Sequence, residues 1–324
     1  NTTLGSDLSE FHSGYRAYSV KALAGVPFEA NSDGFDFDTQ IIVQMMATDQ
    51  RILEVPIPTY YGDEICYVNG IAYARDVVRA VFTYRASRAG LGLPAWVPPP
   101  TEYQVKEQDG SSHNQILEIL GAMPPGKVLD VGCADGSFSA QVRALGHHVT
   151  GIDIRQHPGT STNLDEFYNA DLDEGLPGIG PEYDVIIAAD VIEHVRDPQH
   201  LLNQLAQRLN PSGRMIISTP NFGHWYVRAR VLSGTFDYDR RGILDETHLR
   251  FFTRRSLERI LNGSSLEIEQ MQYSRTHVPF GEPGSKVVRA INRIDEGLIR
   301  ARPTLFGYQF VMVLKPRVLR SQTG

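Results

Sequence analysis

Several acidic side chains and one histidine follow apolar runs that have the length of buried strands. Asp130 lies at the end of the run Val128–Val131, Asp153 ends the run that begins at His148, and Asp190 follows Tyr183–Ala189. Proteins that alternate strands and helices bind their ligands at the carboxyl ends of the strands. The spacing of these residues therefore predicts a ligand site lined by carboxylates.

The turn after the first strand indicates the kind of ligand. It reads D-x-G-x-A-x-G from Asp130 to Gly136, and the small residues let a ligand approach the backbone. A dinucleotide site has G-x-G-x-x-G instead and rests a pyrophosphate on the following helix. A carboxylate at Asp130 would repel a pyrophosphate and would suit a ligand with an ammonium and a sulfonium group. Asp153 comes 23 positions later, near the spacing of about 20 residues at which an acid binds ribose hydroxyls.

This turn resembles motif I of class I S-adenosylmethionine (SAM)-dependent methyltransferases, which usually have Gly where this chain has Ala134. The resemblance covers residues 111–316 and implies a Rossmann-like sheet of seven strands with an antiparallel last strand. It also implies which residues bind the cofactor, with Asp171 and Leu172 at the adenine: Asp130, Gly132, Ala134, Gly136, Asp153, Ile154, Asp171, Leu172 and Asp190.

The segment D-V-I-E-H-V, from Asp190 to Val195, resembles the motif after the fourth strand in ubiquinone-type O-methyltransferases. Three roles remain open for it. Glu193 or His194 could be the catalytic base on an acceptor hydroxyl, because the pKa of histidine lies near working pH. Asp190, Glu193 and His194 could hold a divalent ion such as Mg²⁺, as in some proteins that share the motif. They could also cap and orient the next helix.

The region after the fifth strand is aromatic and basic from Phe222 to Asp245, which suits a lid over an acceptor. Candidate acceptor contacts in and after it are His224, Trp225, His248 and Arg250. Thr253 is predicted to cap the next helix, and the strand Leu305–Leu314 to pair with Leu266–Met271.

Apolar residues recur at helical spacing beside several arginines near the C-terminal end: Val287, Ile291, Ile294 and Leu298. This stripe predicts a core-facing helix. Peripheral contact with a membrane surface, or docking of a partner, is the alternative.

The composition is that of a globular protein, with 324 residues, a net charge of -7 and 41% hydrophobic residues. The charge argues against nucleic acid as the main partner. Two distant cysteines, Cys66 and Cys133, indicate reduced thiols and a cytoplasmic location. No apolar run approaches the roughly 20 residues that span a bilayer. The chain begins at Asn1, and we expect a fragment of a longer parent.

The linker is predicted at residues 89–110, which include Pro98–Pro100, and a tail at 317–324. In the front piece, a helix is expected over Asp36–Thr48, an edge strand over Ile52–Ile57 and a second helix over Val68–Arg88. Three boxes follow one another here: S-G-Y-R from Ser13, F-D-T-Q-I-I-V-Q from Phe37 and E-V-P-I-P from Glu54. With them, residues 1–88 resemble the C-terminal part of family 2 glycosyltransferases of the dolichol-phosphate-mannose-synthase-like kind. The resemblance implies a truncated and inactive GT-A remnant, because the nucleotide-sugar strand and the D-x-D motif would lie upstream.

These observations predict a methyltransferase that acts on the oxygen of a saccharide, a lipid-linked saccharide or a related small molecule, in polysaccharide or glycolipid biosynthesis. One alternative is a non-catalytic SAM-binding or scaffolding module of a bifunctional protein. Another is a nicotinamide-dependent oxidoreductase. The sequence does not define the oligomeric state.

Overall fold

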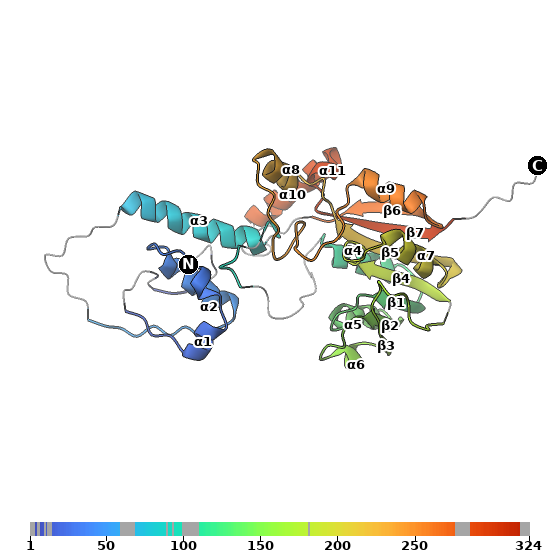
Figure 1. Cartoon of the computed structure of the whole chain (residues 1–324), viewed down its shortest axis with the longest axis horizontal. Coiled ribbons are helices and arrows are strands. Elements are labelled where there is room, and N and C mark those ends of the chain that lie inside the picture. Colours follow the sequence, from blue (N-terminus) through green and yellow to red (C-terminus); the bar gives the residue numbers. More distant parts are fainter. Residues whose placement is uncertain are drawn as a thin grey trace, which may run out of the picture. The chain divides into compact units, whose positions relative to one another are not determined.

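A computed structural model shows how these elements are arranged (Figure 1). It describes residues 4–317 except 5, 6, 10, 12–14, 59–68, 89, 93, 99–109, 181 and 276–285. The chain forms two compact units. The first contains residues 1–102, 238–242 and 278–292, and the second contains residues 103–237, 243–277 and 293–324. Most of the predicted linker and tail, and Cys66, lie outside the described residues.

The described part of the first unit contains helices and no strand: α1 (Val20–Ala24), the 3-10 helix η1 (Phe28–Ala30), α2 (Phe37–Ala47), α3 (Gly70–Arg88) and the start of α10 (Lys286–Ala301). The structure confirms the predicted helix over 36–48 and the described part of the one over 68–88.

The predicted strand over residues 52–57 is wrong, because the structure has no strand there and the segment pairs with none of the described strands. Its apolar side chains are exposed, with Leu53 at 67% and Val55 at 75%. Pro56 has no N–H group to donate to a ladder. The described residues of this unit therefore hold no partial glycosyltransferase sheet.

The second unit is built on a sheet of seven strands in the order β3-β2-β1-β4-β5-β7-β6. The strands are β1 (Lys127–Val131), β2 (His148–Asp153), β3 (Glu166–Asn169), β4 (Tyr183–Ala189), β5 (Leu209–Pro220), β6 (Leu266–Tyr273) and β7 (Gln309–Pro316). Only β7 runs antiparallel to both of its neighbours, β5 and β6. This is the predicted Rossmann-like methyltransferase sheet. Its order reverses between β1 and β4, the position at which such sheets bind ligands.

Helices cover both faces of the sheet. On one face, α4 (Ser112–Gly121) and α5 (Ser137–Ala144) pack on the strand residues Val128, Val149 and Ile187. On the other face, α7 (Pro198–Ala206) and α9 (Arg254–Asn262) pack on Leu129 and Ile186 with their strand neighbours. Apolar residues on both sides of each central strand are therefore buried, as in other parallel sheets. The remaining helices are α6 (Thr160–Asn163), α8 (Trp225–Leu232), α11 (Pro303–Phe306) and the end of α10.

Two helix caps agree with the sequence. The Ser111 hydroxyl accepts a hydrogen bond from the Asn114 amide at the start of α4, and Thr253 forms a capping box with Ser256 at the start of α9. The last strand begins at Gln309 instead of Leu305, because residues 303–306 form α11.

The prediction that the stripe on α10 is core is wrong for two of its residues, because Ile294 is 64% exposed and Leu298 is 39% exposed. Among the described residues, no helix combines the length and the apolar character that a membrane span requires. Cys133 is a free, buried thiol.

Candidate active site

The loop after β1 is tied to the end of β2. The amides of Gly132 and Cys133 both donate to the Ile152 carbonyl, at 2.7 and 3.1 Å. The Asp153 carboxylate accepts from the amide of Ala134 at 2.9 Å and from that of Arg155 at 3.1 Å. Each carboxylate oxygen has a second lone pair, so Asp153 keeps acceptor capacity for ligand hydroxyls. Asp153 thus orders the loop and lies where the sequence predicted a ribose contact.

Asp130 is buried beneath the loop after β1. Its side chain is only 3% exposed and accepts a hydrogen bond from the Ser139 hydroxyl of α5 at 2.5 Å. Burial raises the pKa of Asp130 to about 7, against the opposing effect of the Ser139 bond. Asp130 thus fixes α5 beneath the loop, and its contact with the ammonium group of a ligand stays a prediction.

The other predicted cofactor residues lie at the same edge of the sheet. Asp171 is exposed just beyond β3, and its carboxylate accepts from the Asp173 amide at 2.9 Å. Ile154, directly after β2, is 59% exposed. Leu172 is partly buried against the core. Their proposed contacts with the cofactor stay predictions.

Asp190 is held by the two strands beyond β4. Its Oδ1 accepts from the Ser218 hydroxyl of β5 at 2.7 Å and from the Gln309 side-chain amide of β7 at 2.8 Å. Its φ of 56° turns the chain sharply after the strand. The carboxylate is therefore fixed at the point where β4 ends.

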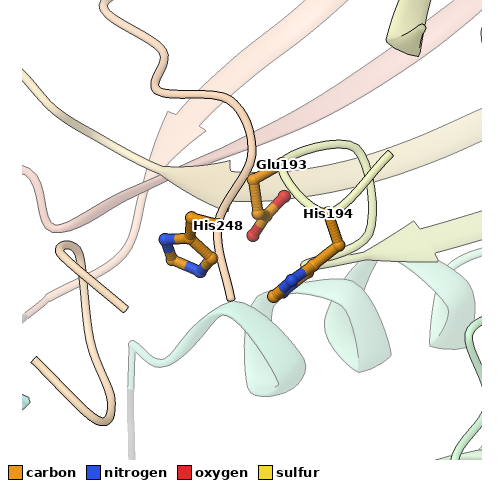
Figure 2. A group of neighbouring side chains, drawn as sticks. All are labelled: Glu193, His194 and His248. Atoms are coloured by element: carbon orange, nitrogen blue, oxygen red, sulfur yellow. The ribbon is translucent and has the colours of Figure 1, made fainter. Parts of the chain in front are cut away.

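Glu193 and His194 follow in the same turn and meet His248, which comes from a distant segment (Figure 2). The backbone brings them together, because the amides of Leu249 and Arg250 donate to the Glu193 carbonyl at 2.8 and 2.9 Å. The rings of His194 and His248 lie 4.8 Å apart, edge to face. Figure 2 shows the Glu193 carboxylate lying between the two imidazoles.

Hydrogen bonds define the tautomers of both histidines. Nδ1 of His194 lies 3.2 Å from the Thr247 carbonyl oxygen, and Nδ1 of His248 lies 3.2 Å from that of Ile243. A carbonyl oxygen only accepts, so each Nδ1 carries the proton and each Nε2 keeps a lone pair. Burial, and then the neighbouring His194, lower the pKa of His248. The cluster thus brings together two imidazole rings and a carboxylate.

The predicted acceptor contacts separate into different environments. His224 is fully buried, caps α8 through Nδ1 and has its pKa lowered to about 4 by burial. Its ring lies edge to face with that of Tyr308 inside the unit, and its contact with the acceptor stays a prediction. Trp225 is 43% exposed. Arg250 donates to the Arg196 carbonyl at 2.5 and 3.2 Å, which holds the turn after Glu193 in place.

Sequence reasoning missed the residues that hold the predicted ones in place. They are Ser139 under Asp130, Ser218 and Gln309 on Asp190, and Thr219, whose hydroxyl donates to Glu193 at 3.0 Å. Ser218 and Thr219 end the apolar stretch of β5, which is a signal of the same kind that singled out Asp190. Nothing in the sequence marks Gln309, because its role depends on the pairing of β7 with β5.

Known proteins share this domain. A family model described as "Methyltransferase domain" matches residues 109–271, half of the chain. A ubiquinone biosynthesis O-methyltransferase of Aeromonas salmonicida is 28% identical over 174 residues, which cover 48% of this chain and 69% of that protein. One of Aromatoleum aromaticum is 31% identical over 130 residues, which cover 35% of this chain and 56% of that protein. This chain thus spans little more than half of the second relative.

A solved structure also matches, that of the Burkholderia thailandensis 1,6-didemethyltoxoflavin-N1-methyltransferase, at 18% identity and a TM-score of 0.43. The match covers 81% of this chain and 99% of the chain in that structure.

The chain belongs to this methyltransferase family, whose members are SAM-dependent enzymes. The donor set of the site fits that cofactor. The side chains that line the edge of the sheet at Asp153, Asp171 and Asp190 are carboxylates, which accept from ribose hydroxyls and attract a cation. When bound, SAM supplies an activated methyl group.

Proposed function

We propose that the protein transfers the methyl group of SAM to a hydroxyl oxygen, with Asp153 at the ribose and with Glu193 and His194 activating the acceptor. One observation carries the proposal. Asp153 ends β2 and the Glu193–His194 turn follows β4, the two parallel strands on either side of β1, so both lie at the carboxyl edge of one sheet. The methyl donor is already activated, so the protein needs to align the acceptor and remove its proton.

We propose that the acceptor is a saccharide, a lipid-linked saccharide or a related small molecule. The O-methyltransferase names of the relatives support an oxygen acceptor. The saccharide rests on the motifs of residues 1–88 alone, as does the proposal that this segment derives from a glycosyltransferase. The reduced thiols favour a cytoplasmic location.

His194→Asn tests the role of the turn. His194 is exposed, so the variant should fold and bind S-adenosylhomocysteine (SAH) like the wild type. Its methyl transfer should fall by about 10²–10⁴-fold, the usual contribution of a group that assists proton removal. The assay uses SAM with a labelled methyl group and a panel of glycans, glycolipids and phenols.

His200→Asn is the matched control, since it alters an exposed histidine on α7 away from the cluster. It should keep wild-type activity. Equal rates for His194→Asn and the wild type would contradict the proposal, and so would label found on nitrogen acceptors alone.

A further inference from the structure

We propose that Gln309, the first residue of β7, positions the Asp190 carboxylate for the cationic methionine end of SAM. Because β7 runs antiparallel to β5, Gln309 lies opposite Pro220, the last residue of β5, at the carboxyl edge of the sheet. The role of Gln309 is indirect, since it acts on the cofactor through Asp190. The inference rests on SAM, the cofactor of this family, and not on the oxygen acceptor proposed above.

Asp190 and Asp153 lie on opposite sides of the loop after β1. The strand β1 pairs with β2, which ends at Asp153, and with β4, which Asp190 follows. The turn at Asp190 packs directly against the loop, because a Cβ added at Gly132 would lie 2.7 Å from Cγ2 of Val191. A cofactor whose ribose is bound by Asp153 therefore has a second carboxylate across the loop. Asp190 is half-buried, and a partly desolvated carboxylate attracts a cation more strongly than one in water.

The backbone of Asp190 needs support to keep this position. Its φ of 56° is left-handed, a conformation that persists only where surrounding groups hold it. Ser218 of β5 supplies part of that support. Its carbonyl and its hydroxyl accept from the Asp190 amide at 3.0 and 3.1 Å, and the same hydroxyl donates to Oδ1 of Asp190 at 2.7 Å.

Gln309 supplies the second donor to the carboxylate. Its side-chain amide donates to the same Oδ1 at 2.8 Å, so donors from two strands converge on one oxygen and fix the orientation of the group. Gln309 is itself held, because it is 3% exposed and its backbone exchanges hydrogen bonds with Ser274 at 3.1 and 3.0 Å. An amide is neutral. It therefore orients Asp190 and leaves the negative charge available to a ligand cation, whereas a lysine there would compensate it.

A double-mutant cycle on the full chain, measured by calorimetric titration with SAH, tests the inference. It uses Gln309→Met, Asp190→Gly and the double variant. Met keeps the length of the side chain without the amide, and Gly tolerates the φ of Asp190. We expect Gln309→Met to weaken SAH binding by about tenfold, since a hydrogen bond to a charged group is lost. In the Asp190→Gly background the same change should cost less than about twofold, because the two residues act as one unit.

Gln44→Met is the matched control, since it removes another buried glutamine amide. Gln44 lies on α2 in the first unit, is 0% exposed and donates to Pro27, Asn31 and Trp96 at 3.1, 2.7 and 2.6 Å. This variant should lower thermal stability while its SAH affinity stays within about twofold of the wild type. Thermal unfolding of every variant shows whether the fold is kept. Gln309→Asn, whose amide is one methylene too short to reach Asp190, repeats the test with a polar side chain and should also weaken SAH binding.

Wild-type SAH affinity in folded Gln309→Met or Gln309→Asn would overturn the inference. An equal loss in the Asp190→Gly background would overturn it as well, since Gln309 would then act by another route than Asp190. Neither result would contradict methyl transfer to an oxygen. Conversely, coupling between Gln309 and Asp190 without label on any hydroxyl acceptor would support the inference and would count against the proposed function alone.

Discussion

Single residues in the loop after β1 adopt a backbone conformation that side chains disfavour. The φ angles of Gly132 and Ala134 are 74° and 49°. Ala134, which stands where the resembling family usually has Gly, therefore keeps the left-handed conformation despite its methyl group. The Asp153 carboxylate helps to hold it there through the hydrogen bond to the Ala134 amide.

Gly132→Ala should destabilise the fold by about 1–3 kcal/mol, since the new Cβ would add left-handed strain and would lie 2.7 Å from Cγ2 of Val191. Gly178→Ala is the control, because a Cβ there meets nothing within 4 Å. Its effect should stay within about 0.5 kcal/mol. Urea unfolding of both variants measures the difference, and equal stabilities would contradict the strain argument.

The sequence predicted the position of those site residues that lie at or directly after the end of a strand. Asp153, Glu193 and His194 each follow an apolar run, and the structure places them at the expected edge. His248 was predicted only as an acceptor contact, since its approach to Glu193 depends on hydrogen bonds between segments over 50 positions apart. His224 was mispredicted because an aromatic, basic segment does not reveal which side chains point inward.

At the scale of elements, short apolar runs located the strands well. The predicted runs that became β2 and β4 end where the structure ends them, at Asp153 and Ala189. The predicted ends of strands are wrong where the local sequence preference disagrees with the pairing of the strands. The strand β5 starts at Leu209 and includes an N-P-S-G sequence, although Pro and Gly are uncommon inside strands. The segment over 52–57 has a strand-like composition but pairs with no strand among the described residues.

At the scale of the whole molecule, the buried Asp130 links stability to pH. Its pKa is about 7 in the folded chain and near 3.8 when exposed. Between these values the native state holds a proton that the unfolded state releases, so this group lowers stability as pH rises from about 4 to 7. The full loss is on the order of 4 kcal/mol at higher pH.

Asp130→Asn should remove this dependence, because an amide does not ionise. The variant's stability relative to the wild type should therefore rise from pH 5 to pH 8. Urea unfolding at both values measures it. A difference that is constant, or that falls over this range, would show that the Asp130 carboxyl does not keep its proton in the fold.

The central claim is that a SAM-type cofactor binds beside Asp153. Calorimetric titration with SAH tests this directly, using the wild type, Asp153→Ala, and Asp184→Ala as control. Asp184 also accepts a hydrogen bond from a backbone amide, that of Lys127 at 2.8 Å, but at the opposite end of β1. We predict that Asp153→Ala weakens SAH binding by about 1–3 kcal/mol through a lost charge-assisted bond, that Asp184→Ala binds like the wild type, and that NAD does not bind. Unchanged SAH affinity in Asp153→Ala, or tight binding of NAD, would contradict the account.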